Sequence, residues 1–280
     1  MTVVARSPAS RSNAAAGGAD EVVAATTDLP EVDGVVVATP TIAHGAAILE
    51  LLPRGVPIFC EKPLTCDVEA ARRVVKKGGD RVFVMDKWRY HKGVEALAAI
   101  ARSGELGPVL GIKSYRLGWG NPHSDVDISW ILLPHDLTVA LEILGDLPRP
   151  TRAVAELDAH GLVSLTGWLE GPAWLVCEVG GRSPEHRRSV ELRCRDGIAV
   201  LDDAYESHIR VLRTGDGQVA GKPSAWEKHP IAEDMPLRAE LAAFVSYLSG
   251  GPPPRSSARE GLLVVETIDQ LRRLAGLGKS

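Results

Sequence analysis

Apolar and polar residues alternate along the first 86 residues in a way that predicts strands separated by helices. Residues 33–41, DGVVVATPT, and the apolar runs 56–60 and 81–86 each predict a buried strand, and a short β-branched run occupies residues 2–6. Apolar residues at helical spacing fill residues 41–52 and 67–79. Acidic residues near the start of the second helix and lysines near its end suit the helix dipole. Strands alternating with helices of this length predict right-handed βαβ units and a parallel sheet.

The pattern changes after Asp86. Helical periodicity covers residues 92–107 and 129–145, and residues 109–119 predict a strand between them. Six strand-like runs follow, at residues 152–159, 161–170, 173–181, 188–194, 197–203 and 208–213, with turn signals between them that predict an antiparallel meander. Amphipathic helices are predicted for residues 236–251 and 258–278. We therefore expect an α/β protein with a domain at residues 1–86 built on a parallel sheet. An α+β domain with a largely antiparallel open sheet should follow at residues 87–280, its last helices packing back toward the first domain.

Composition excludes several classes of protein. The 280 residues are 45% hydrophobic and 24% charged, with a net charge of −4 and no basic block, which argues against nucleic-acid binding. No apolar stretch approaches the roughly 20 residues that cross a bilayer, and no signal-peptide pattern begins the chain. The four cysteines are scattered without metal-ligand spacing, so we expect no metal site, reduced thiols and a cytoplasmic protein.

Two predicted strands end on unusual residues. Thr39 and Pro40 follow one strand, with His44 one helical turn later, and Glu61 and Lys62 follow the next, before a proline. Ligands of open α/β sheets bind outside the carboxyl ends of the strands. A lysine there can act as an acid or base, or as a positive charge on an anion. The alternative is a solvated strand end, which is the more frequent explanation of a lone surface lysine.

A second group of candidates lies beyond residue 86. His135 is flanked by leucines in residues 129–145, so it is either a core histidine or a group for proton transfer near neutral pH. Arg89 belongs to DKWRYHK, residues 86–92, which directly follows a predicted strand and is either a substrate contact or an ordinary surface loop.

These stretches together resemble the Gfo/Idh/MocA oxidoreductases, the family of glucose–fructose oxidoreductase and inositol dehydrogenase. The resemblance covers essentially the whole chain and rests on four blocks in order, at residues 32–65, 87–109, 130–145 and 236–268. It implies a Rossmann domain followed by an α/β domain with an open sheet. The implied activity is NAD- or NADP-dependent transfer of a hydride to or from a sugar, nucleotide-linked sugar or cyclitol, by an oligomer such as a homodimer or homotetramer.

The resemblance also implies roles for the candidate residues. Lys62 and His135 are the expected catalytic residues, with His135 as the base and Lys62 polarising the substrate oxygen. Cofactor contacts are expected from Arg6, Ser7, Thr39, Pro40, His44, Glu61, Lys62 and Arg89, where Arg6 and Ser7 could hold the 2′-phosphate of NADP. Substrate contacts are expected from Arg89, Asp127, Trp130 and Asp136.

Two departures from the family pattern leave a second interpretation open. Relatives usually begin with a central strand and a GxGxxG turn, which this chain lacks, and a Rossmann sheet without that strand has two open edges in its middle. Ile131 stands where relatives often have an aspartate four residues before the histidine; Asp125, Asp127 or Asp136 are candidates to replace it. The alternative is therefore a non-catalytic family member that has lost dinucleotide binding.

Overall fold

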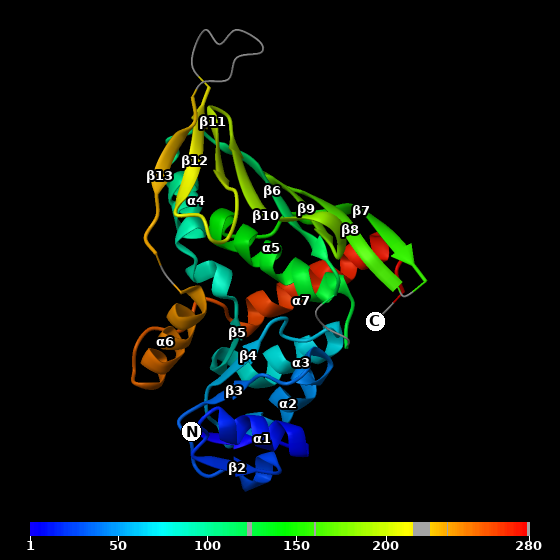
Figure 1. The fold of residues 1–280 in the computed structure, drawn as a ribbon, viewed down its shortest axis with the longest axis vertical. Helices are drawn as coiled ribbons and strands as arrows, with labels where there is room; N and C mark the ends of the chain where they lie inside the picture. The colour runs from blue at the N-terminus through cyan, green and yellow to red at the C-terminus, as the bar shows by residue number, and fades with distance from the viewer. Residues whose placement is uncertain (122–124, 160, 215–224, 234, 279–280) are drawn as a thin grey trace.

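The computed structural model describes residues 1–121, 125–159, 161–214, 225–233 and 235–278. The N-terminal strands and helices lie at one end of the molecule and a large sheet lies at the other, with helices between them (Figure 1). The predicted combination of a parallel sheet with a larger, mostly antiparallel sheet is confirmed.

The N-terminal strands form two separate parallel sheets. Strands β3 (Val35–Val37), β4 (Ile58–Glu61) and β5 (Val82–Met85) pair in the order β3-β4-β5, while β1 (Thr2–Val4) pairs only with β2 (Glu21–Val23). Within the described ranges no ladder joins β1 to β3, as expected for a Rossmann sheet without its central strand.

Helices cover both faces of the three-stranded sheet. On one face lie α2 (His44–Leu51), between the short 3₁₀ turns η2 (Thr41–Ala43) and η3 (Leu52–Arg54), and α3 (Val68–Gly78), which is followed by η4 (Gly79–Arg81). The predicted helices at residues 41–52 and 67–79 are thus present. The helix α6 (Pro236–Leu248) packs on the strands through Phe244, whose ring stacks on Phe59 with centroids 4.8 Å apart.

Three elements near the N-terminus were not predicted. The Ala-rich segment forms α1 (Pro8–Ala16), whose start is fixed by a capping box between Ser7 and Ser10 and by a proline in its first turn. The other elements here are β2 and the short turn η1 (Thr26–Asp28). None of the residues of α1 is buried, so apolar periodicity carried no signal.

The large sheet has eight strands in the order β13-β12-β11-β10-β6-β9-β8-β7. Their bounds are β6 (Val109–Trp119), β7 (Arg149–Asp158), β8 (Gly161–Glu170), β9 (Trp174–Gly180), β10 (Arg182–Cys194), β11 (Gly197–Leu201), β12 (His208–Arg213) and β13 (Glu227–Pro230). The predicted continuous meander is wrong at one point, because β6 lies between β9 and β10 and pairs with β9 in parallel. A period of two identifies a strand but not its neighbours, so the sequence could not show this insertion.

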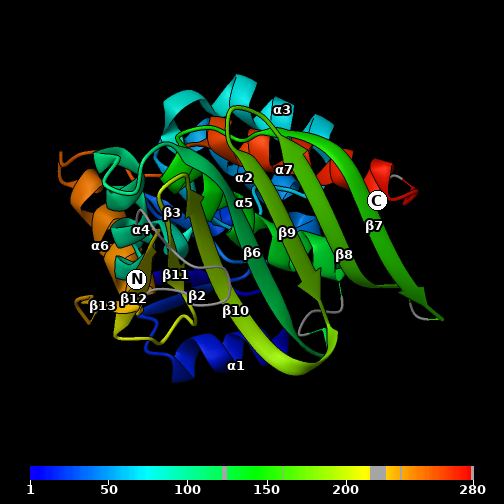
Figure 2. The ribbon, with the colours of Figure 1, turned by 90° about the horizontal axis from the view of Figure 1, so that it is seen from above.

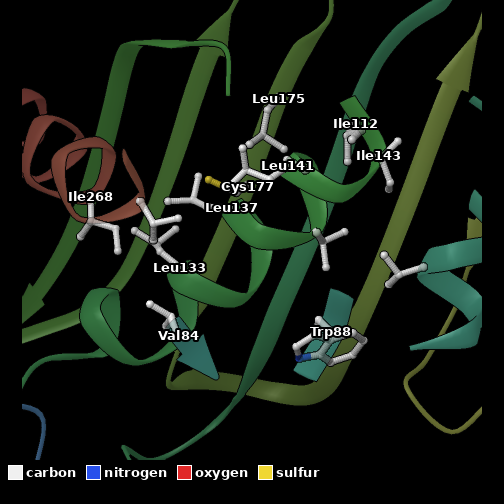
Figure 3. Close-up of a cluster of buried hydrophobic side chains, with 14 of the residues drawn as sticks. Val84, Trp88, Ile112, Leu133, Leu137, Leu141, Ile143, Leu175, Cys177 and Ile268 are labelled. Atoms are coloured by element: carbon white, nitrogen blue, oxygen red, sulfur yellow. The ribbon is translucent and has the colours of Figure 1, made fainter. Parts of the chain in front are cut away.

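Helices α4 (Lys92–Ser103), α5 (Ile128–Leu144) and α7 (Ala258–Leu274) cover one face of the large sheet (Figure 2). Leu133, Leu137 and Leu141 of α5 point among residues of the strands and of α7, including Cys177 and Ile268 (Figure 3). One apolar cluster extends from the N-terminal strands to these helices, joining the two halves. The short turn η5 (Lys87–Tyr90) connects the two halves. The domain boundary that we predicted between residues 86 and 87 stays a prediction.

Across the described ranges, no helix is long and apolar enough to span a membrane. The cytoplasmic location stays a prediction.

Candidate active site

The ends of β3 and β4 bring the first group of predicted residues to one edge of the sheet. Thr39 and Pro40 are exposed just after β3. Glu61 ends β4, and its carboxylate accepts a hydrogen bond from the backbone N–H of Lys62 at 3.1 Å. The following Lys62–Pro63 bond is cis. Because parallel strands end at a common edge, these residues form one rim.

Lys62 reaches from this rim to the helix α5. Its Nζ donates to the backbone carbonyl of Ile131 at 3.0 Å. Burial lowers the pKa of Lys62, and the nearby negative charges of Glu61 and Asp86 oppose this effect. Lys62 therefore bridges the two halves of the molecule as a largely desolvated amine.

His135 lies on α5 one turn after Ile131, and so close to Lys62. Its Nδ1 is buried without a hydrogen-bond partner among the described residues, and its ring meets Trp88 edge-on with centroids 6.4 Å apart. Burial, followed by the positive charge of Lys62, holds the pKa of His135 well below its ordinary value of 6.5. A neutral imidazole with an open nitrogen can accept a proton near neutral pH.

A buried ion pair forms the wall next to His135. Arg116 of β6 donates to the carboxylate of Asp136 at 3.3 Å and lies over the ring of Trp88, 4.4 Å from its centroid. Ser114 also donates to Asp136, so that Asp136 is held by the sheet. Asp136 is therefore adjacent to His135 in the chain, but its carboxylate accepts hydrogen bonds from Arg116 and Ser114.

Sequence reasoning missed Arg116 and Ser114, although a signal was present. In the predicted strand 109–119 they alternate with the residues on the outer face and share the inward face with Ile112, which is fully buried. Two polar residues on the apolar face of a strand indicate either an internal ion pair or a site.

His44 lies beneath the rim and is 1% exposed. Its Nδ1 is 2.8 Å from the carbonyl oxygen of Pro63 and its Nε2 is 3.0 Å from that of Thr39. His44 therefore ties the ends of β3 and β4 together, and the structure gives it no open face for the predicted contact with a cofactor.

Arg89 does not join Lys62 and His135. Its guanidinium forms ion pairs with Glu142 at 3.0 Å and Glu260 at 2.7 Å, and donates to the carbonyl of Arg255. The donors that were expected to bind substrate or cofactor are engaged within the protein, where they link η5 to α5 and α7.

Asp127 and Trp130 also take part in packing. Asp127 caps the N-terminus of α5 and pairs with Arg272 of α7, while the side chain of Trp130 is buried beneath the same guanidinium. The predicted substrate contacts of both residues would require this junction to open.

Arg6 and Ser7 lie at the end of β1. The side chain of Arg6 is 70% exposed, while Ser7 caps α1. They belong to the sheet that does not pair with β3, so the structure does not connect them to Lys62.

Comparison with known proteins places this geometry in context. A sequence profile described as "Oxidoreductase family, NAD-binding Rossmann fold", for Gfo/Idh/MocA proteins, matches residues 4–83. Inositol 2-dehydrogenase 1 of Paenarthrobacter aurescens is 37% identical over 271 residues, covering 86% of this chain and 77% of that protein. UDP-N-acetylglucosamine 3-dehydrogenase of Acidithiobacillus ferrooxidans is 26% identical over 249 residues, covering 87% and 79%.

Solved structures show the same fold. The structure of that UDP-N-acetylglucosamine 3-dehydrogenase superposes with a TM-score of 0.81 at 24% identity, covering 95% of this chain and 86% of the other. A levoglucosan dehydrogenase in complex with NADH and levoglucosan superposes with a TM-score of 0.84 at 16% identity, covering 99% and 88%.

Proposed function

Because the chain belongs to the Gfo/Idh/MocA family of NAD-binding oxidoreductases, we propose that it is a dehydrogenase or reductase of sugars, nucleotide-linked sugars or cyclitols. The observation that carries the proposal is the neutral, unpartnered imidazole of His135 next to the amine of Lys62 at the carboxyl edge of β4. The names of the two sequence relatives, a cyclitol dehydrogenase and a nucleotide-sugar dehydrogenase, support this class of substrate.

The rim fits the nicotinamide half of NAD or NADP. Thr39 and Pro40 offer an exposed surface at the strand ends, and the open Nδ1 of His135 lies close to Lys62. When bound there, the cofactor supplies or accepts the hydride. For the pyrophosphate the fit is incomplete, because the chain contains no GxGxxG turn.

The side chains account for the movement of the proton. In the direction of oxidation, His135 accepts the hydroxyl proton, and its lowered pKa keeps the imidazole neutral and therefore available as the base. In the direction of reduction, His135 returns that proton to the oxygen. Lys62, when protonated, stabilises the developing negative charge on the same oxygen. The wall of Arg116 and Trp88 keeps His135 in a dry, fixed surrounding.

The second candidate is a non-catalytic family member. The apolar Ile131 favours it, because it removes an acid from the face of His135.

Titration with NADH and NADPH, followed by nicotinamide fluorescence, separates the two candidates. Binding together with turnover of a cyclitol or sugar supports the dehydrogenase. No binding at millimolar cofactor refutes it and leaves the non-catalytic alternative. The same titration settles the choice between NAD and NADP, for which an effect of Arg6→Ala on NADPH alone would identify the 2′-phosphate contact.

We further propose that the uncovered face of the eight-stranded sheet pairs with a second copy of the chain, as a homodimer or within a homotetramer. Figure 2 shows no helix of the described ranges over this face. It presents stacked arginine–aromatic pairs, Arg187 on Tyr115 at 3.6 Å and Arg210 on Trp226 at 4.4 Å, a composition enriched in interfaces. Light scattering coupled to size exclusion should show a dimer or tetramer that Arg187→Glu dissociates, whereas Arg102→Glu on α4 does not. A wild-type monomer would contradict the proposal.

A further inference from the structure

Two buried acids, one of them next to Lys62, have no role in the proposed hydride transfer. Glu240 of α6 is 1% exposed, and Asp86, directly after β5, is 3% exposed. Carboxyl groups are almost never fully buried unless something compensates the loss of water.

The packing of α6 fixes the position of Glu240. Phe244 stacks on Phe59 in the middle of β4, and Leu248 approaches Gly34, which precedes β3. The later residues of α6 therefore lie toward the start of the strands. Glu240 is one helical turn before Phe244, about 6 Å in the opposite direction, which is toward the carboxyl ends.

The second acid, Asp86, lies a similar distance from the Phe59 ring toward the carboxyl ends of the strands. Asp86 follows the last residue of β5, and Glu61, two residues after Phe59, ends the neighbouring β4 about 7 Å beyond that ring. Ser256, whose carbonyl accepts from the N–H of Val84 at 2.9 Å, runs alongside β5 at this end. Acidic residues from a strand end and a helix thus converge beside the rim.

Two carboxylate oxygens at this point, Oδ1 of Asp86 and Oε2 of Glu240, lack hydrogen-bond partners among the described residues, and the hydroxyl of Ser256 lies beside Asp86. A carboxylate has acceptors only, so two ionised acids could not satisfy each other. A proton retained by one of them supplies a donor and removes one of the two buried charges.

The charges around the pair favour a proton on Glu240. Burial, together with the negative charges of Asp86 and Glu61 and against the positive charge of Lys87, raises the pKa of Glu240 to about 9. Burial raises the pKa of Asp86, a hydrogen bond from Ser256 and the positive charges of Arg89 and Lys62 oppose this effect, Glu260 adds to it, and the pKa that results is about 7. Asp86 is therefore the member that ionises first.

We propose that Asp86 and Glu240 act as one acidic unit, in which Glu240 keeps its proton and Asp86 carries the single negative charge. This charge helps to hold Lys62 as an ammonium. Its part in catalysis rests on the proposed function. Neither residue touches the reacting atoms, so both are positioning residues. The negative charge of Asp86 adds to the larger effect of Glu61, and together they oppose burial and the positive charges of Arg116 and Lys87, which lower the pKa of Lys62.

A titration of Lys62 tests the unit without any turnover. Lysines labelled by reductive ¹³C-methylation are followed by NMR against pH, and the Lys62 signal is assigned by its loss in Lys62→Arg. We expect Asp86→Asn to move the Lys62 midpoint to lower pH by about one pH unit. Glu240→Gln, which keeps the size and the neutral state, should leave the midpoint unchanged. No movement in Asp86→Asn, or an equal movement in both variants, overturns the proposal.

Infrared spectroscopy provides a second measurement if Asp86→Asn fails to fold. A protonated carboxyl group has its own C=O stretch, and near neutral pH this band should be lost in Glu240→Gln and kept in Glu260→Gln, whose carboxylate is ion-paired. A spectrum in which Glu240→Gln loses no such band refutes the unit. Because neither experiment uses the cofactor, a failed dehydrogenase assay leaves their outcome intact, and the reverse also holds.

Discussion

Replacing Glu240 by glutamine should stabilise the fold near neutral pH. In the folded protein the pKa of Glu240 is raised from 4.5 to about 9, so between these values the folded state holds a proton that the unfolded state releases. The stability that comes from this proton is present in full below 4.5 and is lost as the pH rises toward about 9. Glutamine does not titrate, so it removes this loss while keeping the size of the side chain.

The size of the stability gain follows from the difference between the assay pH and the ordinary pKa of Glu240. At about pH 7.5 the unfolded acid is three pH units above 4.5, and each unit corresponds to about 1.4 kcal/mol of stability. Glu240→Gln should therefore gain up to about 4 kcal/mol in the free energy of unfolding at that pH. The figure is an upper limit, because glutamine must also find partners in the same buried space.

Urea unfolding followed by tryptophan fluorescence measures the effect at about pH 5.5 and about pH 8. The wild type should lose more stability than Glu240→Gln between the two conditions, and Glu170→Gln, at an exposed position, should follow the wild type. Parallel pH profiles of the wild type and Glu240→Gln would refute the reasoning, because they would mean that Glu240 ionises in the folded protein.

Three further predictions address the site. Lys62→Ala should abolish turnover while fluorescence still reports bound nicotinamide; unchanged turnover would remove Lys62 from the mechanism. His135→Asn should lower kcat by about 10²- to 10⁴-fold, and the acid limb of the wild-type pH profile should lie below the ordinary histidine value of 6.5, because the lowered pKa keeps the base neutral to lower pH. Arg89→Met leaves the largely buried Glu142 with only the longer ion pair to Arg255 at 3.8 Å, so it should cost up to about 3–5 kcal/mol in denaturant unfolding without raising KM; a raised KM at unchanged stability would return Arg89 to the substrate site.

Helices and strands whose apolar residues repeat regularly could be predicted from the sequence, whereas elements stabilised by local contacts could not. The strand at residues 109–119 has the predicted bounds, because its inward positions meet the helices along its length. The helix α1 depends on the cap at Ser7 rather than on an apolar face, and the edge strand β13 reads Glu-Lys-His-Pro without alternation. Hydrophobic periodicity reports burial, so it is silent where an element is exposed.

The site divides in the same way. The strand-end rule located Thr39, Glu61 and Lys62, because parallel strands share an edge whatever lies elsewhere. It could not show that the guanidinium of Arg89 donates to Glu142 and Glu260, because these residues are more than fifty positions away in the sequence. Glu240 was overlooked, although it occupies the apolar stripe of α6 one turn before Phe244, where a charged residue is out of pattern.

Ile131 stands where we expected an acid for the proposed base, His135. The three candidates to replace that acid are engaged elsewhere: Asp125 meets the N–H of Ile42 at 3.4 Å, Asp127 pairs with Arg272, and Asp136 pairs with Arg116. No described residue accepts from or donates to Nδ1 of His135. An acid partner would raise the proton affinity of the imidazole, whereas burial beside Lys62 lowers it.

The main chain at position 131 takes part instead, since its carbonyl accepts from the Lys62 amine. The consequence is a site whose positive charge resides on Lys62 and whose histidine is neutral. Such a pair suits a substrate oxygen that gains negative charge as its proton leaves, because the ammonium stabilises that charge while the imidazole takes up the proton. The balance depends on Lys62 remaining protonated in a buried position, which gives the negative charge of Asp86 its importance.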